Sequence, residues 1–184
     1  MSMPAASIHG DASRLAPSLG SDARRQFEAI SANATVALFI LDERQHCLFM
    51  NPAAEALTGY SIAELRDRSF HDVLHHSRPD GSRYPREECP IVRAFPRNSR
   101  EQGEEVFIRK DGSFYPIAFA ASPIRDEAGV IGTIVEIRDI SAEKQRERAL
   151  REETAALEIL NRTGMALAAE LDLERIVQIV TDAA

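Results

Sequence analysis

The segment after Gly103 has a hydrophobic period of two, which is the spacing of side chains on one face of a β-strand. Three strand candidates follow one another there, at residues 106–109, 114–122 and 130–138. The two connections, Asp111-Gly112 and residues 126–129, are short and favour tight hairpin turns. In the last candidate one face carries only β-branched residues: Ile131, Thr133, Val135 and Ile137. The segment therefore predicts an antiparallel sheet with one face packed inward and the other available to water or a partner.

A second hairpin and a helix are predicted upstream of these strands. Residues 35–41 are mostly β-branched and aliphatic, residues 42–46 are polar like a turn, and residues 47–50 are apolar again. Before them, apolar residues recur every three or four positions after the capping residue Ser21, which predicts a helix: Ala23, Phe27, Ile30 and Ala34.

Short helices are predicted between the two groups of strands. Asn51 is suited to cap a helix that has Pro52 at its first position and ends at Gly59. Ser61 and Glu64 have the spacing of a capping box and predict a second helix. An irregular connection is then expected at 76–90, before a short helix at 91–95, because four residues interrupt regular structure: Pro79, Gly81, Pro85 and Pro90.

The segment from Ser141 onward predicts a solvated helix. Acidic and basic side chains are balanced over residues 141–153 and stand at pairing distance on a helix. Leu150 and Leu157 are one heptad apart, and later leucines extend an apolar stripe that Gly164 is expected to break or bend. At the other end of the chain, residues 1–20 lack periodicity and predict a disordered tail.

The composition of the 184 residues is that of a globular protein. Hydrophobic residues make up 44%, which is enough for a packed core, and the net charge of -7 argues against a nucleic-acid surface. No apolar stretch is long enough to span a bilayer, and residues 1–20 lack the apolar segment of a signal peptide. Cys47 and Cys89 are too few for a disulfide framework, so we expect a cytoplasmic, and from the arginine-rich composition a bacterial, protein.

The order of these elements, together with three motifs, resembles a PAS domain over residues 21–140. The motifs are Asn51-Pro-Ala-Ala-Glu-Ala-Leu-Thr-Gly59, Arg109-Lys-Asp-Gly112 and Asp139-Ile-Ser141. The last motif resembles the junction at which PAS domains pass into a signalling helix, here 141–160, and residues 161–184 resemble the start of a truncated GAF domain. The resemblance implies an α+β fold in which short helices cover one face of a five-stranded antiparallel sheet, flanked by an N-terminal helix and the C-terminal signalling helix.

The resemblance also implies a sensory and dimerising module of a bacterial signal-transduction protein. Such a module detects a small ligand or a cofactor state and passes the change to its C-terminal helix, with Asp139 and Ser141 in the position of a relay. The output domain is expected outside this chain and is expected to be a histidine kinase, a phosphatase or a cyclic-nucleotide enzyme. The chain itself shows no phosphate loop, nucleophile elbow or His-Glu-x-x-His motif, so we expect no enzymatic activity in it.

Two further groups of residues follow from the expected fold. Large apolar side chains of the strands and the last short helix are candidates for a ligand pocket, although such residues more often fill a core: Phe39, Phe49, Ile91, Phe95, Phe119 and Val135. The apolar sides of the two terminal helices are candidates for the interface of a parallel homodimer: Phe27, Ile30, Leu150 and Leu157.

Histidines in the middle of the chain suggest an alternative, a haem- or metal-binding redox or gas sensor. His71 and His75 are four residues apart, on one face of a helix, and His76 and Cys89 are within reach through the irregular connection. Imidazole and thiolate are good ligands for transition metals, but this spacing is not that of a structural zinc motif. We expect these side chains to be exposed or hydrogen-bonded in a mobile loop rather than to form a tight metal site.

Comparison with the cofactor-binding PAS subfamilies leaves the cofactor open. LOV-type light sensors carry a reactive cysteine in an Asn-Cys-Arg-Phe-Leu-Gln motif, and the comparable residues 69–75 contain none, so photochemical flavin binding is not expected. Oxygen-sensing haem members place a ligand histidine on the helix before the third strand, and residues 88–95 contain no histidine. A third alternative is an interaction module that binds no ligand because its own side chains fill the cavity.

Overall fold

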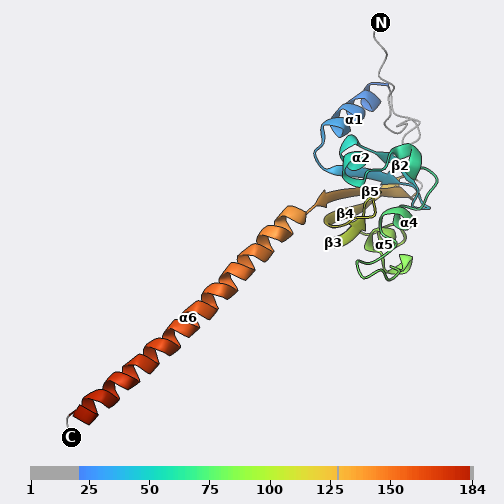
Figure 1. The fold of residues 1–184 in the computed structure, drawn as a ribbon. Helices are drawn as coiled ribbons and strands as arrows, with labels where there is room; N and C mark the ends of the chain where they lie inside the picture. Colours follow the sequence, from blue (N-terminus) through green and yellow to red (C-terminus); the bar gives the residue numbers. More distant parts are fainter. Residues whose placement is uncertain (1–20, 128, 183–184) are drawn as a thin grey trace. The chain divides into compact units, whose positions relative to one another are not determined.

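The computed structural model describes residues 21–127 and 129–182, and the tail predicted at 1–20 lies outside this range. The chain divides after Ser141 into two compact units, which are described separately. The elements, drawn in Figure 1, are α1 (Ser21–Asn33), β1 (Ala37–Leu41), β2 (Cys47–Met50), α2 (Pro52–Thr58), α3 (Ile62–Leu65), α4 (Phe70–Leu74), η2 (Arg86–Glu88), α5 (Pro90–Arg97), β3 (Glu101–Ile108), β4 (Phe114–Asp126), β5 (Gly129–Asp139) and α6 (Ser141–Asp182).

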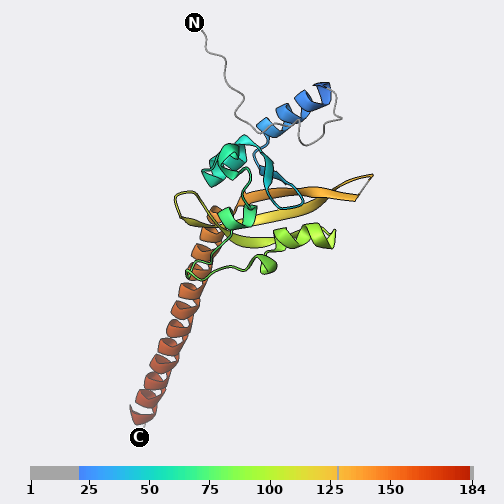
Figure 2. The same ribbon diagram turned by 90° about the vertical axis from the view of Figure 1, so that its right-hand side faces the viewer.

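The first unit is built on a five-stranded antiparallel sheet with the order β2-β1-β5-β4-β3. Strand β5 lies at its centre, paired with β1 on one side and with β4 on the other, and β4 and β5 form the long hairpin of Figure 2. The two edge strands, β2 and β3, are consecutive in the sequence, and the segment that connects them across the sheet contains the short helices. The predicted sheet and helices are confirmed, with β3 beginning at Glu101, five residues before the predicted start at 106.

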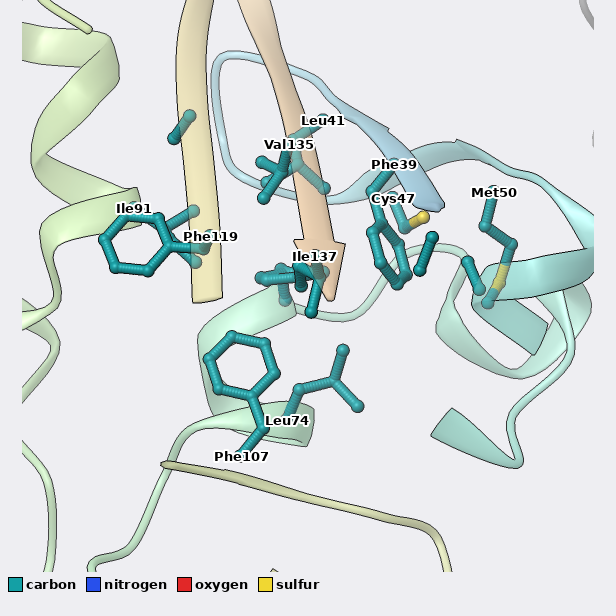
Figure 3. Packing of buried hydrophobic residues seen from close by; sticks show 14 of the residues in the cluster. Phe39, Leu41, Cys47, Met50, Leu74, Ile91, Phe107, Phe119, Val135 and Ile137 are labelled. Atoms are coloured by element: carbon teal, nitrogen blue, oxygen red, sulfur yellow. The ribbon is translucent and has the colours of Figure 1, made fainter. Parts of the chain in front are cut away.

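The short helices cover one face of the sheet, because buried residues of α2, α3, α4 and α5 share a single hydrophobic cluster with the strands. Figure 3 shows part of this cluster. Phe70 of α4 lies between two strand residues, with its ring centroid 5.1 Å from that of Phe39 and 5.9 Å from that of Phe107. Full burial of one such side chain contributes about 1.5–3 kcal/mol, so these rings are a main source of the stability of this unit.

Asn51 joins the sheet to the helices at the end of β2. Its side-chain oxygen accepts hydrogen bonds from the amides of Ala54, 3.0 Å away, and Leu38, 2.9 Å away. Its side-chain nitrogen donates to the carbonyls of Ser31 at 3.1 Å and Val36 at 2.9 Å. The predicted cap of α2 is confirmed, and the amide has its full complement of two donated and two accepted bonds although it is completely buried.

Gly132 marks the closest approach of β5 to β1. A Cβ atom on this residue would lie 2.4 Å from the carbonyl oxygen of Leu41, a backbone atom that a side-chain rotation does not move away. Three residues of the predicted inward face of β5, Thr133, Val135 and Ile137, are buried, whereas Ile131 is 37% exposed. Glycine at position 132 is therefore required by the sheet, although the sequence pattern alone did not single it out.

The second unit is the 42-residue helix α6. It runs without interruption through Gly164, so the predicted break there is wrong; the cost of one glycine in a helix, about 1 kcal/mol, is small beside the many bonds of a helix of this length. Leu150 is 65% exposed and Leu157 is 60% exposed. No helix in the described part of the chain combines the length and the apolarity needed to cross a membrane.

We predict that Asn51→Ala lowers the free energy of unfolding by about 2–4 kcal/mol, because it leaves buried amides and carbonyls without partners. Urea denaturation followed by circular dichroism measures the change. The matched control is Asn33→Ala, since that exposed amide donates one bond, to Ala29, and should be nearly neutral. Equal stabilities of the two variants would contradict the role given to Asn51.

Candidate functional site

His71 of α4 and His75, the residue that follows its last turn, lie buried in the first unit. Ser69 caps this helix by accepting a hydrogen bond from the amide of Asp72, and the spacing of four places His71 and His75 on the same face, as predicted. Each of the two residues is only 2% exposed, and their ring centroids lie 5.7 Å apart. Of the two expected alternatives, exposed or hydrogen-bonded side chains, burial excludes the first for His71 and His75, and their hydrogen bonds agree with the second.

The connection after α4 brings Cys89 to these histidines. Backbone hydrogen bonds order this connection, from the amide of Tyr84 to the carbonyl of His76 and from the amide of Arg78 to the carbonyl of Ser82. Cys89, only 1% exposed, places its Sγ atom 3.4 Å from Nδ1 of His75.

We call His71, His75 and Cys89 the histidine–cysteine cluster, because one ligand atom of each lies within 4.8 Å of those of the other two. His76, the fourth residue predicted for this site, is not part of it. Its side chain is exposed, and its Nδ1 lies 2.7 Å from the hydroxyl of Ser77. The structure therefore brings together three of the four residues named for a metal site and leaves His76 apart from them.

Hydrogen-bond acceptors fix the tautomers of both histidines. Nε2 of His71 lies 3.0 Å from the carbonyl oxygen of Tyr84, and Nε2 of His75 lies 3.3 Å from Oε2 of Glu105. Carbonyl and carboxylate oxygens only accept, so each Nε2 is assigned the proton. Burial lowers the pKa of His71, which keeps that ring neutral and leaves its Nδ1 as a buried lone pair without a hydrogen-bond partner.

Glu105 and Tyr84 both contact His75 beside the cluster, and the sequence analysis did not identify either residue. The hydrogen bond with His75 lowers the pKa of Glu105, against the opposing effect of burial, so this carboxyl is ionised. The Tyr84 hydroxyl donates to Oε1 of Glu105 at 3.2 Å, and its ring stacks on His75 with centroids 4.2 Å apart. Burial and the Glu105 charge raise the pKa of Tyr84 to about 12, and burial raises the pKa of Cys89.

Most of the residues predicted for a ligand pocket are packed into the core (Figure 3). Four of them belong to the hydrophobic cluster and are buried: Phe39, Ile91, Phe119 and Val135. Phe49 is paired with Ile40, the neighbour of Phe39, so it lies on the opposite face of the sheet, where its ring centroid is 5.0 Å from that of Phe27. Phe95 is half-buried on α5. The six residues therefore do not line one common pocket.

The predicted relay residues do lie together. Oδ1 of Asp139 accepts a hydrogen bond of 2.7 Å from the amide of Ser141, and Oδ2 is 2.5 Å from a guanidinium nitrogen of Arg109. Arg109 also donates to the carbonyl of Leu57 and lies over the ring of Tyr115, 3.7 Å from its centroid. We call Arg109, Leu57, Asp139 and Ser141 the Arg109 junction; the sequence had placed Arg109 only in a motif.

Comparisons with known proteins agree with this architecture. A family model described as PAS fold matches residues 25–140, more than half of the chain. The chain belongs to the PAS family. A nitrogen fixation regulatory protein of Klebsiella oxytoca is 26% identical over 153 residues, which are 82% of this chain and 30% of that protein. The chain thus spans about a third of the length of this curated relative.

Solved structures share the same fold at low sequence identity. An RNA-binding light-oxygen-voltage receptor has a TM-score of 0.60 and 24% identity, over 75% of this chain and 39% of that one. A PAS domain from Colwellia psychrerythraea has a TM-score of 0.53 and 20% identity, over 64% of this chain and 97% of that one. The family match ends at residue 140, so it gives no support to a GAF-like domain at 161–184, where the structure continues α6 to Asp182.

The Arg109 junction predicts a specific pH dependence. Burial raises the pKa of Asp139, but the hydrogen bonds from Ser141 and Arg109 outweigh it, and the folded-state pKa lies below the ordinary 3.8. The folded state therefore binds fewer protons than the unfolded state, so the stabilisation is complete above pH 3.8 and is lost as the pH falls through the lowered value. The difference in unfolding free energy between the wild type and Asp139→Asn, measured in urea, should shrink in this range. If the difference in unfolding free energy between the two proteins stayed constant down to about pH 2, the lowered pKa of Asp139 would be contradicted.

Proposed function

We propose that residues 21–140 are the sensory module of a bacterial signal-transduction protein, and that the Arg109 junction passes the state of this module to α6. The observation that carries the proposal is the position of one guanidinium, which contacts the end of a helix over the core and the carboxylate at the end of β5. The output domain lies outside this chain and belongs to the kinase, phosphatase or cyclic-nucleotide enzyme classes. In this proposal the chain itself senses the signal and catalyses no reaction.

The first link of this route joins the core to the β3–β4 hairpin. Ala54 and Thr58 of α2 are buried, so a change in the core beneath this helix acts on it directly. At the end of α2, the carbonyl of Thr58 accepts a hydrogen bond of 2.9 Å from the amide of Lys110. Together with the bond from Arg109 to Leu57, this ties the end of α2 to the hairpin at two successive carbonyls.

The second link joins the hairpin to the start of α6. Asp139 is shared between Arg109 and the amide of Ser141, the first residue of α6, so a displacement of the guanidinium changes the cap of this helix. Coupling between separate sites requires a connected element with distinct arrangements, and a carboxylate that is either paired or released provides one. The similarity to a nitrogen fixation regulatory protein supports a regulatory role of this kind.

A dimer through α6 is the second part of the proposal. Leu150 and Leu157 lie one heptad apart on this helix and are largely exposed. A single helix with such a stripe gains little from its own hydrogen bonds in water, whereas pairing with a second copy buries the leucines. In α1, Ile30 is 72% exposed and remains available for the same interface, but the ring of Phe27 already packs on Phe49.

We predict that Arg109→Ala increases amide hydrogen exchange at 140–144, because Asp139 loses the partner that orients it toward Ser141. Exchange in β1 and β2 should not change, and mass spectrometry of peptides from the full chain measures both. The matched control is Arg78→Ala, because Arg78 also pairs with a carboxylate, Glu88, and lies over a tyrosine ring. Unchanged exchange at 140–144 in Arg109→Ala would refute the relay.

We predict that Leu150→Glu combined with Leu157→Glu shifts the chain from dimer to monomer in analytical ultracentrifugation, because two charges replace buried apolar contacts. The sheet should keep its circular dichroism spectrum. The control pair is Arg148→Glu with Ala155→Glu, one heptad apart on the opposite side of the helix, and should leave the dimer intact. A wild type that is monomeric at high micromolar concentration would overturn the dimer but not the relay.

A further inference from the structure

We propose that the histidine–cysteine cluster binds one divalent metal ion of intermediate Lewis-acid softness, such as Zn²⁺. The ligands are Nδ1 of His71, Nδ1 of His75 and the sulfur of Cys89. The inference goes beyond the signalling role and does not depend on it. Two independent observations point to a ligand: three ligating atoms within 4.8 Å of one another, and a buried Nδ1 on His71 that has no hydrogen-bond partner. A metal ion would use that lone pair.

The surroundings orient both imidazoles for this purpose. The backbone carbonyl of Tyr84 holds Nε2–H of His71, and Glu105 holds Nε2–H of His75, so both lone pairs lie on Nδ1. An outer carbonyl or carboxylate on the second ring nitrogen is the usual arrangement around metal-binding histidines, because it fixes the tautomer and makes the ligand more basic.

The separations between the three ligand atoms are close to those of a tetrahedral zinc site. With Zn–N bonds of about 2.0–2.1 Å and a Zn–S bond of about 2.3 Å, the ligand atoms of a tetrahedral site are about 3.3–3.6 Å apart, and a water molecule would be the fourth ligand beside the three side chains. The separation of 3.4 Å between His75 Nδ1 and Cys89 Sγ already meets this value. The largest separation is at most 4.8 Å, so side-chain rotations would have to shorten it by up to about 1.2–1.5 Å.

The chemistry of the site favours a single ion of this class. Nitrogen and sulfur ligands favour zinc and its neighbours over magnesium or calcium, which prefer oxygen. On binding, the Cys89 thiol gives its proton to solvent and the sulfur bonds to the metal, so the charge of +2 is balanced by one thiolate and by the neighbouring carboxylate of Glu105. Haem fits less well, because the rings of Tyr84 and Phe107 pack on His75 at 4.2 and 4.8 Å.

The first experiment measures metal content. The full chain is stripped with a chelator under reducing conditions, incubated with Zn²⁺ and passed through a desalting column, and we expect one zinc per chain. With Co²⁺, the same protein should show a thiolate-to-cobalt charge-transfer band and the intense visible bands of tetrahedral coordination. Uptake well below one equivalent, or a cobalt spectrum without the thiolate band, would overturn the proposal, as would haem absorption in the protein as purified.

Variants then assign the ligands. His71→Ala and Cys89→Ser should each lose at least about tenfold in zinc affinity, and Glu105→Gln should lose about 10–100-fold while keeping the thiolate band. The matched controls are His76→Ala and Cys47→Ser, which lie outside the cluster and should bind as the wild type does. Circular dichroism checks that each variant folds. Equal zinc binding by folded His71→Ala and the wild type would refute the assignment, whereas the Arg109→Ala exchange experiment uses no metal and tests the relay separately.

Discussion

The buried amide of Asn51 is the interaction on which the arrangement of the first unit depends. It holds the end of α1, the start of β1 and the first turn of α2 at one point through four hydrogen bonds. Strand β1 in turn connects β2 to the central β5, so this point sets how the short helices lie over the sheet. Because each unpaired buried group costs about 1–3 kcal/mol, few alternative side chains would hold these elements together.

The histidine–cysteine cluster contacts the same sheet at the edge formed by β3. His71 lies on α4, His75 directly follows it and Cys89 directly precedes α5, but Glu105, which orients His75, belongs to β3 at the edge of the sheet. Glu105 therefore reaches His75 only when the crossover has folded back and β3 has paired with β4.

Much of the fold could be predicted from the sequence, because its strands, hairpin turns and helix caps are encoded locally. The cap formed by Asn51 was predictable, but its bonds to Leu38, Val36 and Ser31 were not, since those partners are 13 to 20 residues away. The spacing of His71 and His75 predicted their shared face. Their burial and their link to Glu105 depend on the path of the long loop and on where β3 begins, which no local pattern specifies. Phe49 was assigned to the wrong face because strand register, not composition, decides which side a residue occupies.

Strand β3 connects the two sites. Glu105 lies on β3 and Arg109 follows its last residue, so the two are four positions apart, about 13 Å along an extended chain. Residues two apart in a strand share a face, so Glu105 lies on the same side of β3 as the core-packed ring of Phe107. An ion bound at the proposed site would attract the Glu105 carboxylate, and a shift of this segment would move the backbone that carries Arg109. Strand β3 and one ion pair, Arg109 with Asp139, therefore connect the proposed metal site to the start of α6.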